Sequence, residues 1–136
     1  MSTNIPVTVS IVFLFSLLNI LSGCSSTVIQ ADPIQIKRLV FLNQSSKALS
    51  NVRIYVSKSR EFASCGYILP NTECSTGFPL REYKGNSFDI SWSEKGENKS
   101  KQNIQAIVPV SLNLEKPVNA VITFGENAAF SASLLQ

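Results

Sequence analysis

The chain has 136 residues, of which 44% are hydrophobic and 15% are charged, and its formal net charge is +3. This length favours a single domain, and so small a positive charge gives no indication of nucleic-acid binding. The sequence contains no histidine. Catalytic Ser-His and Cys-His pairs, and zinc sites that depend on histidine, are therefore excluded.

The first segment of the chain is uncharged and predicts a targeting signal. No charged residue precedes Asp32, and residues 11–18 form the apolar run IVFLFSLL. The run is shorter than the ~20 apolar residues that a membrane-spanning helix needs, and it suits the hydrophobic region of a secretory signal peptide. A longer, interrupted apolar stretch from Ile5 to Leu21 leaves an uncleaved membrane anchor as the alternative.

A short motif, Leu21-Ser22-Gly23-Cys24, ends the apolar run and is followed by polar residues. It resembles the lipobox of bacterial lipoproteins, although the segment before the run lacks the Lys or Arg that is usual in signal peptides. The resemblance implies that residues 1–23 are a cleaved signal peptide. It also implies that Cys24 carries diacylglycerol on its thiol and a further acyl chain, such as palmitate, on its amino group. Residues 24–33 then form the lipidated cysteine and a tether.

Such a modification would attach the protein to a membrane of the cell envelope. Two or three acyl chains hold a protein on a bilayer effectively permanently, whereas a single chain binds only marginally. Ser25, rather than Asp, follows the cysteine. By resemblance to lipoprotein sorting in proteobacteria, this residue implies the outer membrane, with the domain facing the periplasm. A simple signal peptide with an unmodified Cys24 is the alternative.

The remaining cysteines, Cys65 and Cys74, form an even pair. In an exported chain such a pair forms a disulfide by default. The bridge would close a short loop, in which Gly66 and Pro70-Asn71 supply turn chemistry. Closing it would stabilise the fold by about 2–3 kcal/mol. A redox or metal-binding pair is the alternative, but the spacing is not that of a Cys-x-x-Cys motif and no further ligands are in sight.

Apolar and polar residues alternate along most of the chain after residue 33, which predicts half-buried strands. Residues 34–42 are apolar on both faces after Arg38, and residues 104–108 predict a strand that Val110, Leu112 and Leu114 continue. The alternating segments are 52–57, 88–93, 118–124 and 130–134, and turn signals lie at 43–46, 65–74, 84–86, 94–98 and 125–127.

This pattern contains no helical period and predicts an all-β domain over residues 34–136. The number of short strands favours a small antiparallel β-sandwich, immunoglobulin-like in architecture, with Trp92 on a core strand. Cys65 and Cys74 are too close in sequence for the inter-sheet disulfide of true immunoglobulin domains.

The sequence shows no arrangement of residues that is typical of an enzyme. Most acidic residues fall in turns or between the apolar residues of strands, so we expect them at the surface. Glycine-rich phosphate loops and aspartate-rich calcium loops are absent from the sequence. We therefore predict a non-enzymatic protein without a cofactor or a bound metal. The acidic residues are Asp32, Glu61, Glu73, Glu82, Asp89, Glu94, Glu97, Glu115 and Glu126.

A basic segment is the first candidate binding region. Every charged residue between Lys37 and Arg60 is basic. These residues are either ordinary outward-facing side chains that protect strand edges, or an electropositive face for an anionic envelope surface or partner. The candidate residues of that face are Arg53, Tyr55, Lys58 and Arg60.

The disulfide loop and its continuation form the second candidate region, with Tyr67, Leu69 and Phe78. These side chains either contact a partner protein or pack beneath the loop as a satellite core. The main functional prediction is an anchored structural or protein-interaction module with an envelope protein as partner. The alternative is a ligand-binding module for an envelope polysaccharide or lipid. A concave pocket would favour the ligand module, and a flat apolar patch would favour the interaction module.

Overall fold

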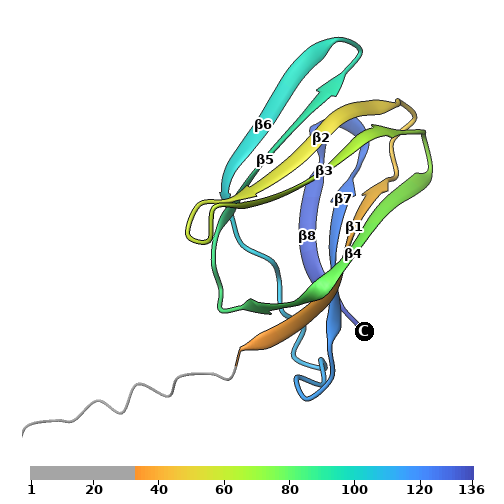
Figure 1. Cartoon of the computed structure of the whole chain (residues 1–136). Helices are drawn as coiled ribbons and strands as arrows, with labels where there is room; N and C mark the ends of the chain where they lie inside the picture. The colour runs from red at the N-terminus through yellow and green to blue at the C-terminus, as the bar shows by residue number, and fades with distance from the viewer. Residues whose placement is uncertain (1–32) are drawn as a thin grey trace, which may run out of the picture. The chain divides into compact units, whose positions relative to one another are not determined.

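The computed structural model describes residues 33–136, except for the side chains of Phe78 and Pro79 (Figure 1). Cys24, the signal peptide and nearly all of the tether lie outside the described residues. The strands are β1 (Ile34–Asn43), β2 (Leu49–Val56), β3 (Glu61–Ile68), β4 (Thr72–Tyr83), β5 (Phe88–Glu94), β6 (Glu97–Ile104), β7 (Val118–Phe124) and β8 (Phe130–Leu135), with a 3-10 turn at Glu126–Ala128.

The strands form two four-stranded sheets, which we call sheet A, in the order β4-β1-β7-β8, and sheet B, in the order β3-β2-β5-β6. Neighbouring strands are antiparallel, except that β1 and β7 are parallel. The predicted all-β sandwich is therefore confirmed. No helix among the described residues has the length and apolar character that a membrane crossing requires.

The core lies between the sheets and contains a cluster of three aromatic rings. Trp92 of β5 is 3% exposed and packs edge to face against Phe124 of β7, with 5.2 Å between ring centroids. It also stacks on Phe130 of β8 at 6.4 Å. The prediction that Trp92 lies on a core strand is confirmed.

The region predicted as a disulfide loop consists instead of the ends of two strands. β3 runs to Ile68, β4 begins at Thr72, and the Thr72 amide donates a hydrogen bond to the Leu69 carbonyl at 3.3 Å across the turn. The Cys65–Cys74 disulfide is confirmed, with the two Cα atoms 6.4 Å apart. Because β3 and β4 are edge strands of different sheets, the bridge joins sheet B to sheet A.

The strand predicted over residues 104–108, and its continuation at 110–114, is wrong. β6 lies earlier, over Glu97–Ile104, and follows a hairpin turn in which Lys95 and Gly96 both have positive φ angles. Its side chains are polar on both faces except at Ile104, and most of them are exposed, so alternation could not reveal it. The segment after it contacts β8 through a single bridge, between Ile107 and Ser133, and is otherwise irregular.

Candidate functional site: an apolar cavity between the sheets

The two sheets separate along the edge formed by β3 and β4. These strands meet at their connecting turn, are tied together by the disulfide, and diverge from there (Figure 1). A cavity of about 730 Å³ lies between the sheets at the diverging end, which we call the open end. This volume is within the range of small-molecule binding sites, about 300–1,000 Å³.

The walls of the cavity are apolar, and small side chains create its volume. Large side chains such as Leu39, Ile54 and Phe88 line it from three strands. At other positions that line the cavity, on β3, β7, β8 and the segment after β6, the chain carries alanine. An alanine where a neighbouring strand carries Ile or Phe leaves space that the rigid sheets cannot close. The alanines that line the cavity are Ala63, Ala106, Ala120 and Ala132.

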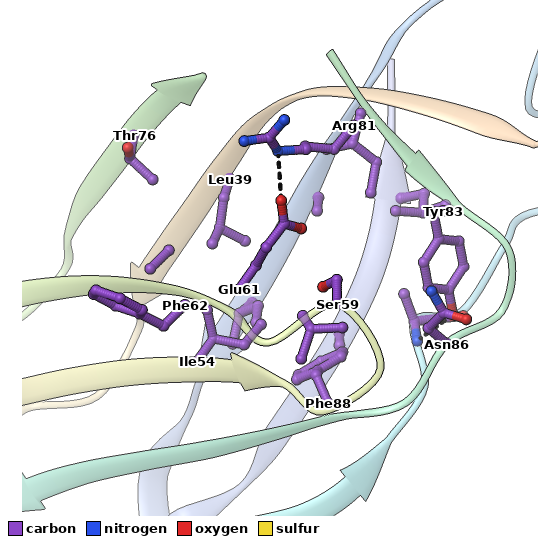
Figure 2. A pocket seen from close by; sticks show the side chains of 18 of the residues that line it. Leu39, Ile54, Ser59, Glu61, Phe62, Thr76, Arg81, Tyr83, Asn86 and Phe88 are labelled. Carbon is purple, nitrogen blue, oxygen red and sulfur yellow. Dashed lines mark hydrogen bonds and ion pairs between the residues drawn. The ribbon is translucent and has the colours of Figure 1, made fainter. Parts of the chain in front are cut away.

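One ion pair spans the mouth of the cavity. Figure 2 shows Glu61 of β3 and Arg81 of β4 reaching toward each other, with 3.1 Å between the Glu61 Oε1 and Arg81 Nε atoms. The pair links sheet B to sheet A at the open end, as the disulfide does nearer the turn. Its side chains are 48% and 52% exposed, so it contributes only about 0–1 kcal/mol to stability.

Further polar groups surround this pair. Ser59 and Arg60 approach from the turn between β2 and β3, and Tyr83 approaches from the end of β4. The Tyr83 hydroxyl accepts a hydrogen bond from the Ala106 amide at 3.1 Å, which fixes the ring beside the cavity. The result is an apolar chamber with a charged rim at its mouth.

Glu61 is exposed, as the sequence predicted, but sequence reasoning did not place it at a site and did not single out Arg81. Glu61 alternates with Ala63 and Cys65, and Cys65 must face inward for its bridge to reach the other sheet. The strand period therefore points Glu61 inward as well. This signal was present in the sequence but required the extent of β3 to be known.

The basic residues between Lys37 and Arg60 do not form one face. Lys37 and Arg38 are on β1 in sheet A, whereas Arg53 is on β2 in sheet B. Arg38 is paired with Glu73 at 3.4 Å. Lys37 and Arg38 are therefore separated from Arg53, because β1 and β2 belong to opposite sheets. That Arg53, Tyr55, Lys58 and Arg60 form an electropositive binding face stays a prediction.

Arg53 and Tyr55 both project from the outer face of sheet B. Arg53 lines a shallow polar hollow of about 430 Å³ together with serine and asparagine side chains of β5 and β6. Tyr55 is 42% exposed and is paired in register with Phe62, which is 73% exposed. Of the other candidate residues of this group, Arg60 reaches the cavity mouth and Lys58 lies beside it in the turn.

The second predicted region is not assembled with the first. Tyr67 pairs with Ser50, at the opposite end of β2 from Tyr55. Tyr67 and Leu69 are 63% and 55% exposed, so these two side chains do not pack as a satellite core. Phe78 belongs to β4, but its side chain lies outside the described residues.

The end of the sandwich away from the cavity contains a buried ion-pair cluster, contrary to the expectation that Glu94 is a surface residue. Glu94 is 7% exposed and accepts hydrogen bonds from the Lys47 Nζ atom at 2.8 Å and the Lys99 Nζ atom at 2.9 Å. These bonds, from Lys47 first and then Lys99, lower the pKa of Glu94 below its ordinary value of 4.5. The same contact raises the pKa of Lys47.

Asn43, predicted only as part of a turn, is the second buried polar group at this end. It is fully buried, and its Nδ2 atom donates to the backbone carbonyls of Lys47, Ile68 and Leu69 at 2.8, 3.2 and 3.1 Å. Its Oδ1 atom accepts from the Ser45 amide at 3.0 Å. A single side chain thus ties β1 to the turn after it and to the end of β3.

No group of three or more potential metal ligands occurs within residues 33–136. The lining of the cavity is mainly apolar, and the charged residues that line it are exposed to solvent.

No protein-family model matches the chain, and no curated protein matches it. Among solved structures, the NMR structure of a protein from Eubacterium rectale is similar, with a TM-score of 0.43 and 12% sequence identity. The match covers 73% of this chain and 85% of that chain. At this score and identity, the similarity carries no argument about function.

Proposed function

We propose that the protein is a lipid-anchored lipoprotein of the cell envelope whose β-sandwich binds an apolar ligand between its sheets without chemical conversion. The cavity at the open end is the observation that supports this function. It is concave, and its lining is mainly apolar. A concave pocket is what distinguishes a ligand-binding module from an interaction module, so the geometry favours a lipid ligand over the protein partner that the sequence first indicated.

The anchor is supported by the lipobox motif that ends at Cys24. Growth of the native host with labelled palmitate would test it. Label should enter the wild-type protein and be absent from the Cys24→Ala variant. Mass spectrometry of the wild-type protein should show a mature chain that begins at the modified cysteine. An unmodified Cys24 would overturn the anchor but leave the binding function to be tested separately.

Binding can be tested with a neutral probe that fluoresces in apolar surroundings, such as N-phenyl-1-naphthylamine. We would use the full chain with Cys24→Ser, so that no covalent acyl chain competes for the cavity. Ala63→Leu and Ala120→Leu, made in this background, should fill the cavity and weaken probe binding by about tenfold or more, or about 1.4 kcal/mol. Probe affinity that is equal in all variants would overturn the proposal.

A matched control is available outside the cavity. Ala129 is exposed in the segment before β8 and does not line the chamber. Ala129→Leu adds the same side-chain volume and should leave the probe affinity unchanged. The N-terminal segment is common to all of these variants, so its contribution to the fluorescence cancels in the comparison.

A protein-interaction surface is the second candidate function. Tyr55 and Phe62 form an exposed cross-strand aromatic pair on β2 and β3, and exposed aromatic side chains are enriched at protein interfaces. A photoreactive amino acid at position 62 should then crosslink to a defined envelope protein in cells. The same group at position 75, in β4 of the other sheet, should not give that product.

A further inference from the structure

We propose that the cavity takes a single-chain amphiphile with an anionic head group, such as a fatty acid, and that the head group replaces Glu61 as the partner of Arg81. This inference rests on the proposed binding function and names the class of ligand. Its starting point is the position of one exposed ion pair across the mouth of an apolar chamber, where a ligand's tail would enter and its head would stop.

The tail of the ligand would lie between the sheets. The chamber is bounded by inward side chains of both sheets, among them Ile54, Phe88 and Leu134, and every charged residue in its lining is exposed to solvent. Apolar walls gain free energy when they exchange water for an alkyl chain, in proportion to the area covered. The cavity has a volume of about 730 Å³, which is in the range of sites for one small ligand, so we take a single alkyl chain as its occupant.

The charges at the mouth favour an anionic head. Glu61 is paired with Arg81, and Glu82 is paired with Lys84 at 3.0 Å. Arg60, which also lines the mouth, makes no ion pair within residues 33–136, and Lys58 precedes it in the same turn. After pairing, the mouth therefore keeps an excess of positive charge, which attracts an anion and opposes a cation.

Arg81 can exchange one carboxylate for another at little cost. Its bond to Glu61 is half exposed, and exposed ion pairs are weak. The ion pair joins the Arg81 Nε atom to the Glu61 Oε1 atom at 3.1 Å, and a guanidinium can also hold a carboxylate through two parallel bonds. A ligand whose tail is already bound presents its head at high effective concentration, so it competes well with the Glu61 side chain.

The test compares ligands that share a tail and differ in the head. Dodecanoic acid, dodecanol, methyl dodecanoate and dodecyl phosphate would compete with the neutral probe at neutral pH in the full chain with Cys24→Ser. We expect the two anions to bind about tenfold or more tightly than the alcohol and the ester, the range of a charge-assisted hydrogen bond. The acid and the phosphate separate a free fatty acid from a lysophospholipid as the source of the head group.

Arg81→Gln should remove this preference, so that the ratio of dodecanoic acid affinity to dodecanol affinity falls by about tenfold or more. Arg38→Gln is the matched control, because Arg38 forms a similarly exposed pair with Glu73 away from the mouth. Equal affinity for all four ligands in the wild type would overturn the inference but leave the binding function intact. A loss of acid and alcohol binding alike in Arg81→Gln would also overturn it. Failure of every ligand to displace the probe would overturn both.

Discussion

The two ends of the sandwich are formed by the same strands but are completed in different ways. At the closed end, which contains Asn43, Trp92 and Glu94, large rings fill the space between the sheets and buried polar groups are fully bonded. At the open end, alanines leave a chamber and a half-exposed ion pair, Glu61–Arg81, spans the gap. Stability is therefore concentrated at one end, which leaves the other available for a ligand.

The largest expected change in stability comes from a comparison of two phenylalanines, one at each end of the sandwich. Phe124 is 2% exposed among other rings at the closed end, and Phe88 is 7% exposed but lines the cavity. Phe124→Ala should lower the free energy of unfolding by about 3–5 kcal/mol. Phe88→Ala should cost less, because a side chain beside a cavity has fewer atoms to contact. Urea unfolding measures both, and equal losses would contradict the contrast.

Removal of the disulfide should have the next largest effect on stability. The bridge between Cys65 and Cys74 marks the boundary between the closed and the open part of the β3–β4 edge. Replacing both cysteines by serine should lower the free energy of unfolding by about 2–3 kcal/mol, as expected for a loop of this length. Reducing agent should produce a similar loss in the wild type and none in the double variant.

The closed end was largely predictable from the sequence, since along its strands buried apolar side chains alternate with more exposed ones. The strands that carry Trp92 and Phe124 bury one face and show it as alternation. The pairing of Glu94 with Lys47 was not predictable. It joins residues far apart in the chain, and Glu94 stands beside Lys95-Gly96, which only indicates a turn.

The open end was missed for a physical reason that is itself informative. Glu61 and Arg81 occupy positions at the cavity mouth where a closed sandwich would carry apolar residues. The sequence indicated a loop over residues 65–74 because of its two cysteines, Gly66 and Pro70-Asn71, and the strands that carry Glu61 and Arg81 on either side were not predicted. Charged side chains interrupt an apolar strand face mainly where a site requires it, and Glu61 and Arg81 do so at the mouth of the cavity.

The buried Glu94 cluster should make the stability of the closed end depend on pH. A carboxyl group with a lowered folded pKa stabilises the fold above its unfolded value of 4.5, and this contribution is lost as the pH falls toward the folded pKa. We expect the free energy of unfolding to decrease below about pH 4.5 and Glu94→Gln to flatten that decrease. Glu115→Gln, at an exposed position, controls for the loss of one charge.

Glu61→Gln should have the smallest effect on stability of these variants, and it tests the difference between the closed and the open end most directly. If the pair with Arg81 is one that a ligand can displace, its loss should change the free energy of unfolding by no more than about 1 kcal/mol. The same variant should bind dodecanoic acid more tightly, because the ligand no longer competes with a protein carboxylate, and should bind dodecanol as before. A stability loss as large as that caused by Glu94→Gln would instead show that the Glu61–Arg81 pair holds the two sheets together at the open end. The two ends would then differ only in the residues that join the sheets.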